Sequence, residues 1–273
     1  MERKKIAVLG CSHTAYDQVF HKIGLRQGND GKDWVHYASD RFKNLEFHNY
    51  ACQGHGPLYY DIVLKYILAE LPENFYNTVI IQYTVNGRWL HPVHVGDFFP
   101  DKNIIEEMQL EQKEENYYVG RMHPQRLMST RHETYVYGID SNNEKDVELS
   151  KEVGKYVTGL HQPDGIATMY ESSFIKSFNK LYAPHFKNAY WWDFSNSLFN
   201  EAVDEKLKGW KNNIDREVPF KEWTIEKYGI EYLAKHLLDD SFHCTEQGNK
   251  LLFNEYLMDS LLGKHLETLN AQS

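Results

Sequence analysis

The alternation of short apolar runs with amphipathic segments constrains the fold of this chain more than any other feature. The run Thr78–Tyr83, with the sequence TVIIQY, is mostly apolar, which is typical of a buried strand in a parallel sheet. Lys5–Leu9 and Leu45–Tyr50 have a similar character. An amphipathic helix is expected to begin near Thr14 and another at Pro57, where proline suits a first helical turn. Strands alternating with helices predict a parallel sheet covered on both faces.

The second half of the chain repeats this pattern after a less regular stretch. We interpret residues 88–165 as an insertion into a single domain that spans residues 1–273, with a possible strand inside the insertion. The expected elements from that strand onward are a strand at Thr134–Gly138, a helix near Ser172–Tyr182, a strand at Ala189–Asp193, helices around Glu201–Asn212 and Thr224–Leu238, and a last helix from Thr245 to about Leu262. We therefore expect an α/β fold, a three-layer α/β/α sandwich with a mainly parallel five-stranded sheet in a flavodoxin-like layout.

Charge and composition exclude several classes of function. The chain has 39 acidic against 30 basic residues and a formal net charge of -9, and it has no basic stripe of the kind that nucleic-acid binding requires. No run approaches the roughly 20 apolar residues of a membrane span, and Ile6–Leu9 is too short for a signal peptide. Three cysteines, an odd number, do not suggest a disulfide framework. We expect a cytoplasmic protein with neither nucleic acid nor membrane as a partner.

Four polar segments stand where an open parallel sheet binds its ligands, beyond the carboxyl ends of strands. GCSHT, CQGHG and TVNGR follow the first three expected strands, and DDSFHCTEQGNK precedes the last expected helix. A serine hydroxyl such as that of Ser12 needs an adjacent base to become a nucleophile. His243 can be that base if a third group fixes its tautomer, and Asp240, three residues earlier, can turn its carboxylate to the ring.

In these segments the chain resembles the SGNH hydrolases, also called the GDSL-like esterase and lipase superfamily. Gly10-Cys11-Ser12 is similar to the Gly-Asp-Ser turn of the family, with Cys11 in place of the aspartate. The later blocks of the family are matched by Gly54, Asn86, Asp240, His243 and Gly248. Asn86 is flanked by Thr84 and Gly87, where the family usually has Gly and Asp. The resemblance implies the SGNH hydrolase fold.

By this resemblance Ser12, Asp240 and His243 are the catalytic residues, and the backbone N–H groups of Ser12 and Gly54 with the side chain of Asn86 form the oxyanion hole. No metal and no organic cofactor is implied. The implied activity is that of a serine esterase, which hydrolyses a carboxylic ester through an acyl-enzyme on Ser12. The expected substrate is a short acyl or O-acetyl ester, a small molecule or a carbohydrate-borne group. Two alternatives remain: an O-acyltransferase with the same triad, and a catalytically inactive binding protein on this fold.

Each candidate residue also has a simpler interpretation. Ser12 can be a helix cap, the Asp240–His243 segment a surface loop, and Gly54 and the Asn86-Gly87 pair ordinary turns. Cys11 offers a thiol nucleophile as an alternative, because helix N-termini lower thiol pKa values.

Other residues suggest further sites less strongly. His91, His94 and Asp97 resemble metal ligands, although Pro92 between the histidines favours an ordinary loop. Most aromatic residues are expected in the core, Trp191 and Trp192 among them. For Trp89, Phe98 and Tyr117, which lie in the insertion, stacking on a sugar ring is an alternative to a place in the core.

Overall fold

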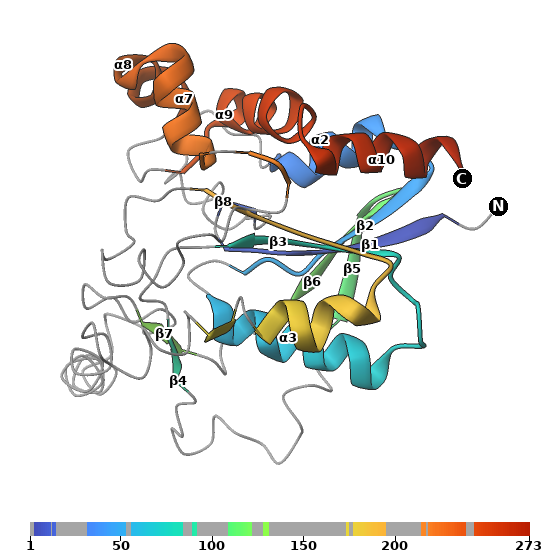
Figure 1. Cartoon of the computed structure of the whole chain (residues 1–273). Helices are drawn as coiled ribbons and strands as arrows, with labels where there is room; N and C mark the ends of the chain where they lie inside the picture. The colour runs from blue at the N-terminus through green and yellow to red at the C-terminus, as the bar shows by residue number, and fades with distance from the viewer. Residues whose placement is uncertain are drawn as a thin grey trace.

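A six-stranded sheet forms the centre of the described part of the molecule (Figure 1). The computed structural model describes residues 3–11, 13–14, 32–52, 56–83, 89–91, 109–121, 128–130, 173–174, 177–194, 214–216, 218–238 and 243–273. The strands are β1 (Lys4–Leu9), β2 (Leu45–Asn49), β3 (Thr78–Tyr83), β4 (Trp89–His91), β5 (Gln109–Glu114), β6 (Tyr117–Arg121), β7 (Met128–Thr130) and β8 (Asn188–Asp193). The helices are α2 (Trp34–Arg41), α3 (Pro57–Glu70), α7 (Phe220–Tyr228), α8 (Ile230–Tyr232), α9 (Glu246–Leu251) and α10 (Leu261–Ala271). Shorter or π-helical turns are η4 (Phe178–Tyr182), η5 (Ala183–His185), η6 (Leu233–Leu237) and η7 (Leu252–Leu257).

The sheet has the strand order β5-β6-β2-β1-β3-β8. Five of these strands are parallel, as expected, and β5 adds a sixth, antiparallel strand at the edge beside β6. The run β2-β1-β3-β8 has the order of the first four strands of a flavodoxin-like sheet. The fifth parallel strand differs, because β6 extends the sheet beyond β2 instead of beyond β8. Both β5 and β6 come from within residues 88–165, so this segment contributes to the main sheet.

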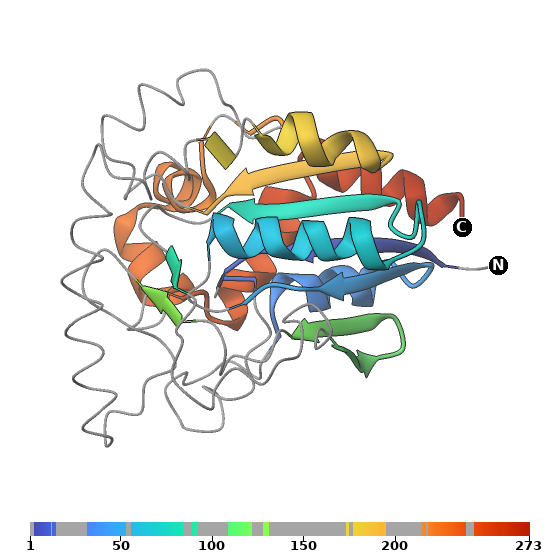
Figure 2. The ribbon, with the colours of Figure 1, turned by 90° about the horizontal axis from the view of Figure 1, so that it is seen from below.

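Helices cover both faces of the sheet, which confirms a layered α/β arrangement (Figures 1 and 2). Successive side chains of a strand point to opposite faces. Ile6 and Val8 of β1 therefore pack in the core that includes side chains of α2, η7 and α10, whereas Ala7 and Leu9 pack in the core beneath α3 and η4. Trp191 and Trp192 of β8 lie in the two cores in the same way and are 4% and 0% exposed.

Local signals explain where several helices begin and end. Asp33 caps α2 by accepting a hydrogen bond from the backbone N–H of His36 at 2.9 Å. The helix expected over Thr224–Leu238 is broken at Gly229, whose φ of 86° places it in the left-handed region. The last expected helix is also two helices. Its first part ends with η7, and Ser260 caps the separate helix α10 by accepting from Leu262 and Gly263.

Some expected elements fall outside the described residues. They are the helix beginning at Thr14, the strand at Thr134–Gly138 and the helix at Glu201–Asn212. Among the helices that the structure does describe, none has the length and apolar character needed to cross a membrane.

Candidate active site

The parallel strands all point to the side of the sheet that lies away from the two chain termini (Figure 2). The chain leaves β1 for β2 on one side and then crosses to β3 on the other, so a switch point lies between β1 and β3. Ligands of open α/β sheets bind outside the carboxyl ends of strands at such a point. Gly10–Thr14 follows β1 at this place, and Gln82 and Tyr83 end β3 next to it.

A buried hydrogen-bond network ties the end of β1 to β3. The side-chain oxygen Oε1 of Gln82 lies 3.1 Å from the backbone nitrogen of Cys11, 3.2 Å from its Sγ and 3.2 Å from Oγ1 of Thr14. Gln82 Nε2 donates to the carbonyl oxygen of Tyr83 at 2.6 Å. Gln82, Cys11 and Thr14 are all 0% exposed, so water does not compete for these groups.

Residues of the neighbouring elements hold the same turn. The indole Nε1 of Trp34, on α2, donates to Thr14 Oγ1 at 2.9 Å. The side-chain amide of Asn49, at the end of β2, donates to the Thr14 carbonyl at 2.7 Å. The turn is so close-packed that a Cβ atom at Gly10 would lie 2.7 Å from Cβ of Thr14. Glycine is therefore required at position 10 for steric reasons.

Two imidazole rings from opposite ends of the sequence lie together at this edge. The ring of His13 stacks on Phe194, with centroids 3.6 Å apart and planes inclined by 10°. Its centroid is also 5.1 Å from that of His243, at an angle of 34°. Phe194 directly follows β8 and is 5% exposed. The three rings therefore form one aromatic group that joins the segments after β1 and β8 to the segment before α9.

The backbone on either side of these rings is well anchored. Phe194 contacts Phe220 of α7 at 5.6 Å between centroids, and its carbonyl oxygen accepts from the backbone N–H of Lys221 at 3.0 Å. The segment of His243 is held by a bridge between Cys244 and Leu238. Thr245 also caps α9 by accepting from the backbone N–H of Gly248 at 3.1 Å. His243 thus reaches the site from the rigid start of the C-terminal helices.

The last residue of β8 is Asp193, which directly precedes Phe194. Burial raises the pKa of the Asp193 carboxyl from 3.8 to about 8, and the nearby Glu222 of α7 adds to the effect. Asp193 pairs with Tyr83 in the sheet register, so it lies at the same carboxyl edge as Gln82. At neutral pH this position therefore carries a mainly uncharged acid, which can donate a hydrogen bond.

Of the residues expected in the site, the structure describes one in full. His243 is partly buried and lies next to His13. Ser12, Gly54, Asn86 and Asp240 lie outside the described residues. Gln82, Phe194 and Asp193 were not predicted. Their positions at or after strand ends were readable from the sequence, but nothing in a buried strand pattern indicates which side chains meet across the sheet.

Two alternative interpretations can be compared with the structure. Cys11 is fully buried and its thiol donates to Gln82, so it is a packing residue in this turn and is not presented to a substrate. Tyr117 is also fully buried, and its hydroxyl donates to Asp33 Oδ2 at 2.8 Å. The alternative that Tyr117 stacks on a sugar is therefore wrong, and Tyr117 lies in the core because β6 is part of the main sheet. The side chains of Trp89, Phe98, His91, His94 and Asp97 lie outside the described residues.

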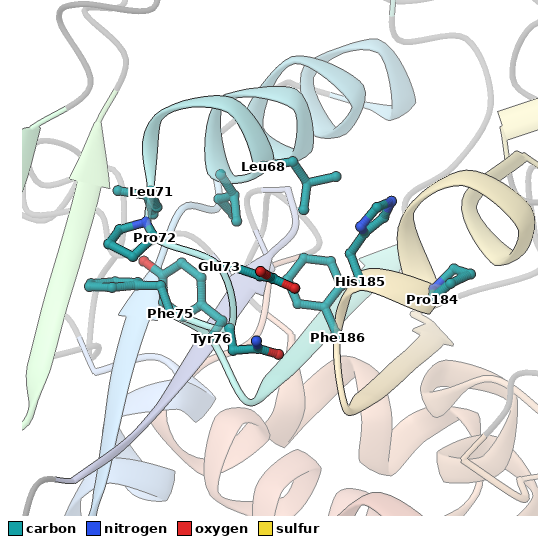
Figure 3. Close-up of a pocket in the computed structure, with 11 residues that line it drawn as sticks. Leu68, Leu71, Pro72, Glu73, Phe75, Tyr76, Pro184, His185 and Phe186 are labelled. Carbon is teal, nitrogen blue, oxygen red and sulfur yellow. The ribbon is translucent and has the colours of Figure 1, made fainter.

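A surface pocket lies at the opposite edge of the sheet (Figure 3). It is lined by the end of α3 and by the loops that enter β3 and β8, including Leu68, Phe75 and Phe186. Because those loops precede their strands, the pocket is remote from the carboxyl edge. Within the described ranges, no group of three or more His, Cys, Asp or Glu side chains is placed to hold a metal ion.

No protein-family model matches this chain, and no curated protein matches its sequence. The function must therefore be argued from the geometry at the carboxyl edge of the sheet.

Proposed function

We propose that this chain is a serine esterase of the SGNH hydrolase type, in which Ser12, His243 and Asp240 act together. The observation that carries the proposal is the 5.1 Å separation of the ring centroids of His13 and His243. Ser12 directly precedes His13 in the sequence, and Asp240 lies three residues before His243. A meeting of these two segments is what proton transfer between a hydroxyl and an imidazole requires.

The fold supports the same assignment. An SGNH hydrolase fold needs a layered α/β sheet whose first strand ends at a switch point, and the order β2-β1-β3-β8 provides one between β1 and β3. The turn after β1 is held by buried hydrogen bonds from β3, α2 and β2. A nucleophile gains most from a position that is fixed before the substrate binds.

The proposed reaction has two stages. Ser12 Oγ attacks the ester carbonyl carbon while His243 accepts its proton, and Asp240 orients His243 and stabilises the imidazolium. The N–H groups of Ser12 and Gly54 and the amide of Asn86 bind the oxyanion. The tetrahedral intermediate collapses, and the alcohol leaves with the proton from His243. Water, deprotonated by His243, then releases the carboxylic acid and restores Ser12.

The substrate class follows from the resemblance and from composition. Short acyl esters, including O-acetyl groups on sugars, are typical of the family that this chain resembles. The mean hydropathy of -0.63 favours a small or carbohydrate-borne ester over a long-chain lipid.

A fluorophosphonate probe tests the proposal directly. Its phosphorus is attacked by an activated serine and fluoride leaves, so a covalent adduct forms only where a base activates the hydroxyl. We expect wild-type protein to be labelled, Ser12→Ala to be unlabelled, and Asp240→Asn to be labelled slower by a factor on the order of 10⁴. Ser173→Ala, at an exposed serine, is the matched control and should be labelled like the wild type.

The outcome of labelling separates the possible functions. A folded wild-type protein that is not labelled would refute the enzyme and favour a binding protein. If Ser12 is labelled, product analysis of a p-nitrophenyl acetate reaction, with and without a sugar alcohol, distinguishes hydrolysis from acyl transfer. Release of acetate at the same rate in both reactions is the result expected of an esterase.

A further inference from the structure

Gln82 is a buried polar residue near the end of the mostly apolar strand β3. β3 has the sequence TVIIQY and all of its residues are buried. A buried amide is costly unless each of its groups has a hydrogen-bond partner. The amide of Gln82 has partners on both sides, Cys11 and Thr14 at the oxygen and the Tyr83 carbonyl at the nitrogen. None of these is part of the proposed catalytic machinery, so the amide must be explained by the turn that it holds.

The orientation of this amide is fixed by chemistry. The backbone N–H of Cys11 can only donate, and the Tyr83 carbonyl can only accept, so Oε1 must face Cys11 and Nε2 must face Tyr83. The indole of Trp34 can likewise only donate, so the Thr14 hydroxyl accepts from it and gives its own hydrogen to Gln82. The hydrogen bonds therefore run in one direction, from Trp34 through Thr14 and Gln82 to Tyr83.

The residues that Gln82 holds bracket the proposed nucleophile. Cys11 immediately precedes Ser12, and Thr14 is two residues after it. The backbone N–H of Thr14 also donates to the Cys11 carbonyl at 2.9 Å. Through these contacts one side chain of β3 fixes both flanks of position 12.

We propose that Gln82 is a positioning residue for the esterase, one that holds the turn so that the Ser12 hydroxyl stays within reach of His243. This rests on the proposed function. Gln82 acts through Cys11 and Thr14 and needs no contact with the substrate. Its removal lowers the rate of the chemical step and leaves substrate affinity nearly unchanged, because a small misplacement of a reacting group costs about 100-fold in rate.

Two variants test this role. Gln82→Met keeps the length and loses the hydrogen bonds, and it should lower kcat for p-nitrophenyl acetate by about 100-fold with KM within about twofold. Gln82→Glu can make the same hydrogen bonds as glutamine only when its carboxyl group is protonated. Its O–H then donates to the Tyr83 carbonyl, and its other oxygen accepts from Cys11 and Thr14. When ionised, it sets a carboxylate oxygen against that carbonyl. Its rate relative to wild type should therefore fall at least tenfold between pH 5.5 and pH 9.

The groups around position 82 make this ratio interpretable. Among the described residues, the titratable groups bonded to Gln82 are the Cys11 thiol, which donates to its side-chain oxygen, and the Tyr60 hydroxyl of α3, which donates to its backbone carbonyl at 3.1 Å. Tyr83 and Asp193 lie at the same edge of the sheet, one register position further along. All of them, and His243, are present in the wild type too, so dividing by the wild-type rate at each pH removes their contribution. Gln112→Glu, at an exposed position of β5, is the matched control and should give a constant ratio.

Each result decides a separate point. Rates are divided by the folded fraction from near-ultraviolet circular dichroism at the same pH, so loss of folding does not imitate loss of positioning. A Gln82→Glu ratio that is independent of pH overturns the proposal for Gln82, and this holds even if Gln82→Met fails to fold. If wild type is not labelled by the fluorophosphonate, the esterase itself is refuted. Labelled wild type with a flat Gln82→Glu ratio refutes the role of Gln82 alone.

Discussion

Asp193 should make the protein less stable as the pH rises from acid to neutral, and Asp193→Asn should remove that loss. The carboxyl ionises near pH 3.8 in the unfolded chain and near pH 8 in the folded protein, because burial and the neighbouring Glu222 both oppose its charge. Between these values the unfolded state is ionised and the folded state is not. The unfolded state therefore binds fewer protons, and the free energy of unfolding falls as the pH rises.

The size of the effect follows from the same two values. Each pH unit inside the window lowers the free energy of unfolding by about 1.4 kcal/mol, so two units, from pH 5 to pH 7, lower it by up to about 3 kcal/mol. Asparagine has nearly the volume of the neutral acid and does not titrate. Between pH 5 and pH 7 the free energy of unfolding of Asp193→Asn should thus fall by about 3 kcal/mol less than that of wild type. Groups that do not interact with Asp193 titrate equally in both proteins and cancel in the comparison, whereas Glu222 is coupled to Asp193 and is tested by its own variant.

Urea denaturation followed by tryptophan fluorescence at pH 5, 6, 7 and 8 measures this difference. Glu222→Gln removes the second cause and leaves the burial, so its curve should lie between those of wild type and Asp193→Asn. Asp259→Asn, at an exposed carboxylate, is the surface control and should follow the wild type. Parallel curves for wild type and Asp193→Asn would show that the folded carboxyl ionises normally, and the argument from burial would be wrong.

Two further substitutions test the site from either side. Phe194→Leu keeps an apolar side chain but loses the ring on which His13 stacks at 3.6 Å. Labelling of Ser12 by the fluorophosphonate should therefore slow by about tenfold, which corresponds to roughly 1.4 kcal/mol of lost ring contact. An unchanged labelling rate would show that the stack does not support His243. Cys11→Asp, which introduces the residue typical of SGNH hydrolases, would set a carboxylate against Gln82 Oε1 and should lower the free energy of unfolding by about 1–3 kcal/mol in urea titrations. Cys11→Ser keeps a donor for Gln82, so its free energy of unfolding should fall less. Equal decreases in the two variants would contradict this reasoning.

The strands that carry the site were predictable because their signal is local. Both faces of TVIIQY and KIAVL carry apolar residues, and a sheet covered by helices on both sides buries such runs. The structure confirms these strands as β3 and β1 and the helix beginning at Pro57 as α3. The α/β fold class therefore followed from the hydrophobic pattern alone. The place of β6 beside β2 did not.

The elements that were missed depend on longer-range contacts or on single residues. β6 lies in a polar stretch, and its place beside β2 depends on Tyr117 reaching Asp33 and Asn49, which no local pattern reveals. The break at Gly229 and the cap at Ser260 had readable signals, a glycine and a serine before an apolar run. In the site, the polar segments at the first strand end and before the last helix were expected to meet, and the contact between His13 and His243 joins these two segments. The roles of Gln82, Phe194 and Asp193 could not be predicted, because each depends on a partner from another strand or helix.

The described contacts around the two halves of the proposed site differ in kind. The turn around position 12 is fixed by short, directional hydrogen bonds between buried groups, which tolerate little displacement. The ring of His243 contacts that of His13 with centroids 5.1 Å apart and planes inclined by 34°, and a ring contact is less directional than a hydrogen bond. A base that serves first the serine oxygen, then the leaving alcohol and then water must turn between oxygen atoms, whereas the nucleophile must not move. The hydrogen-bonded turn thus meets the requirement that the proposed acyl-enzyme mechanism places on its nucleophile.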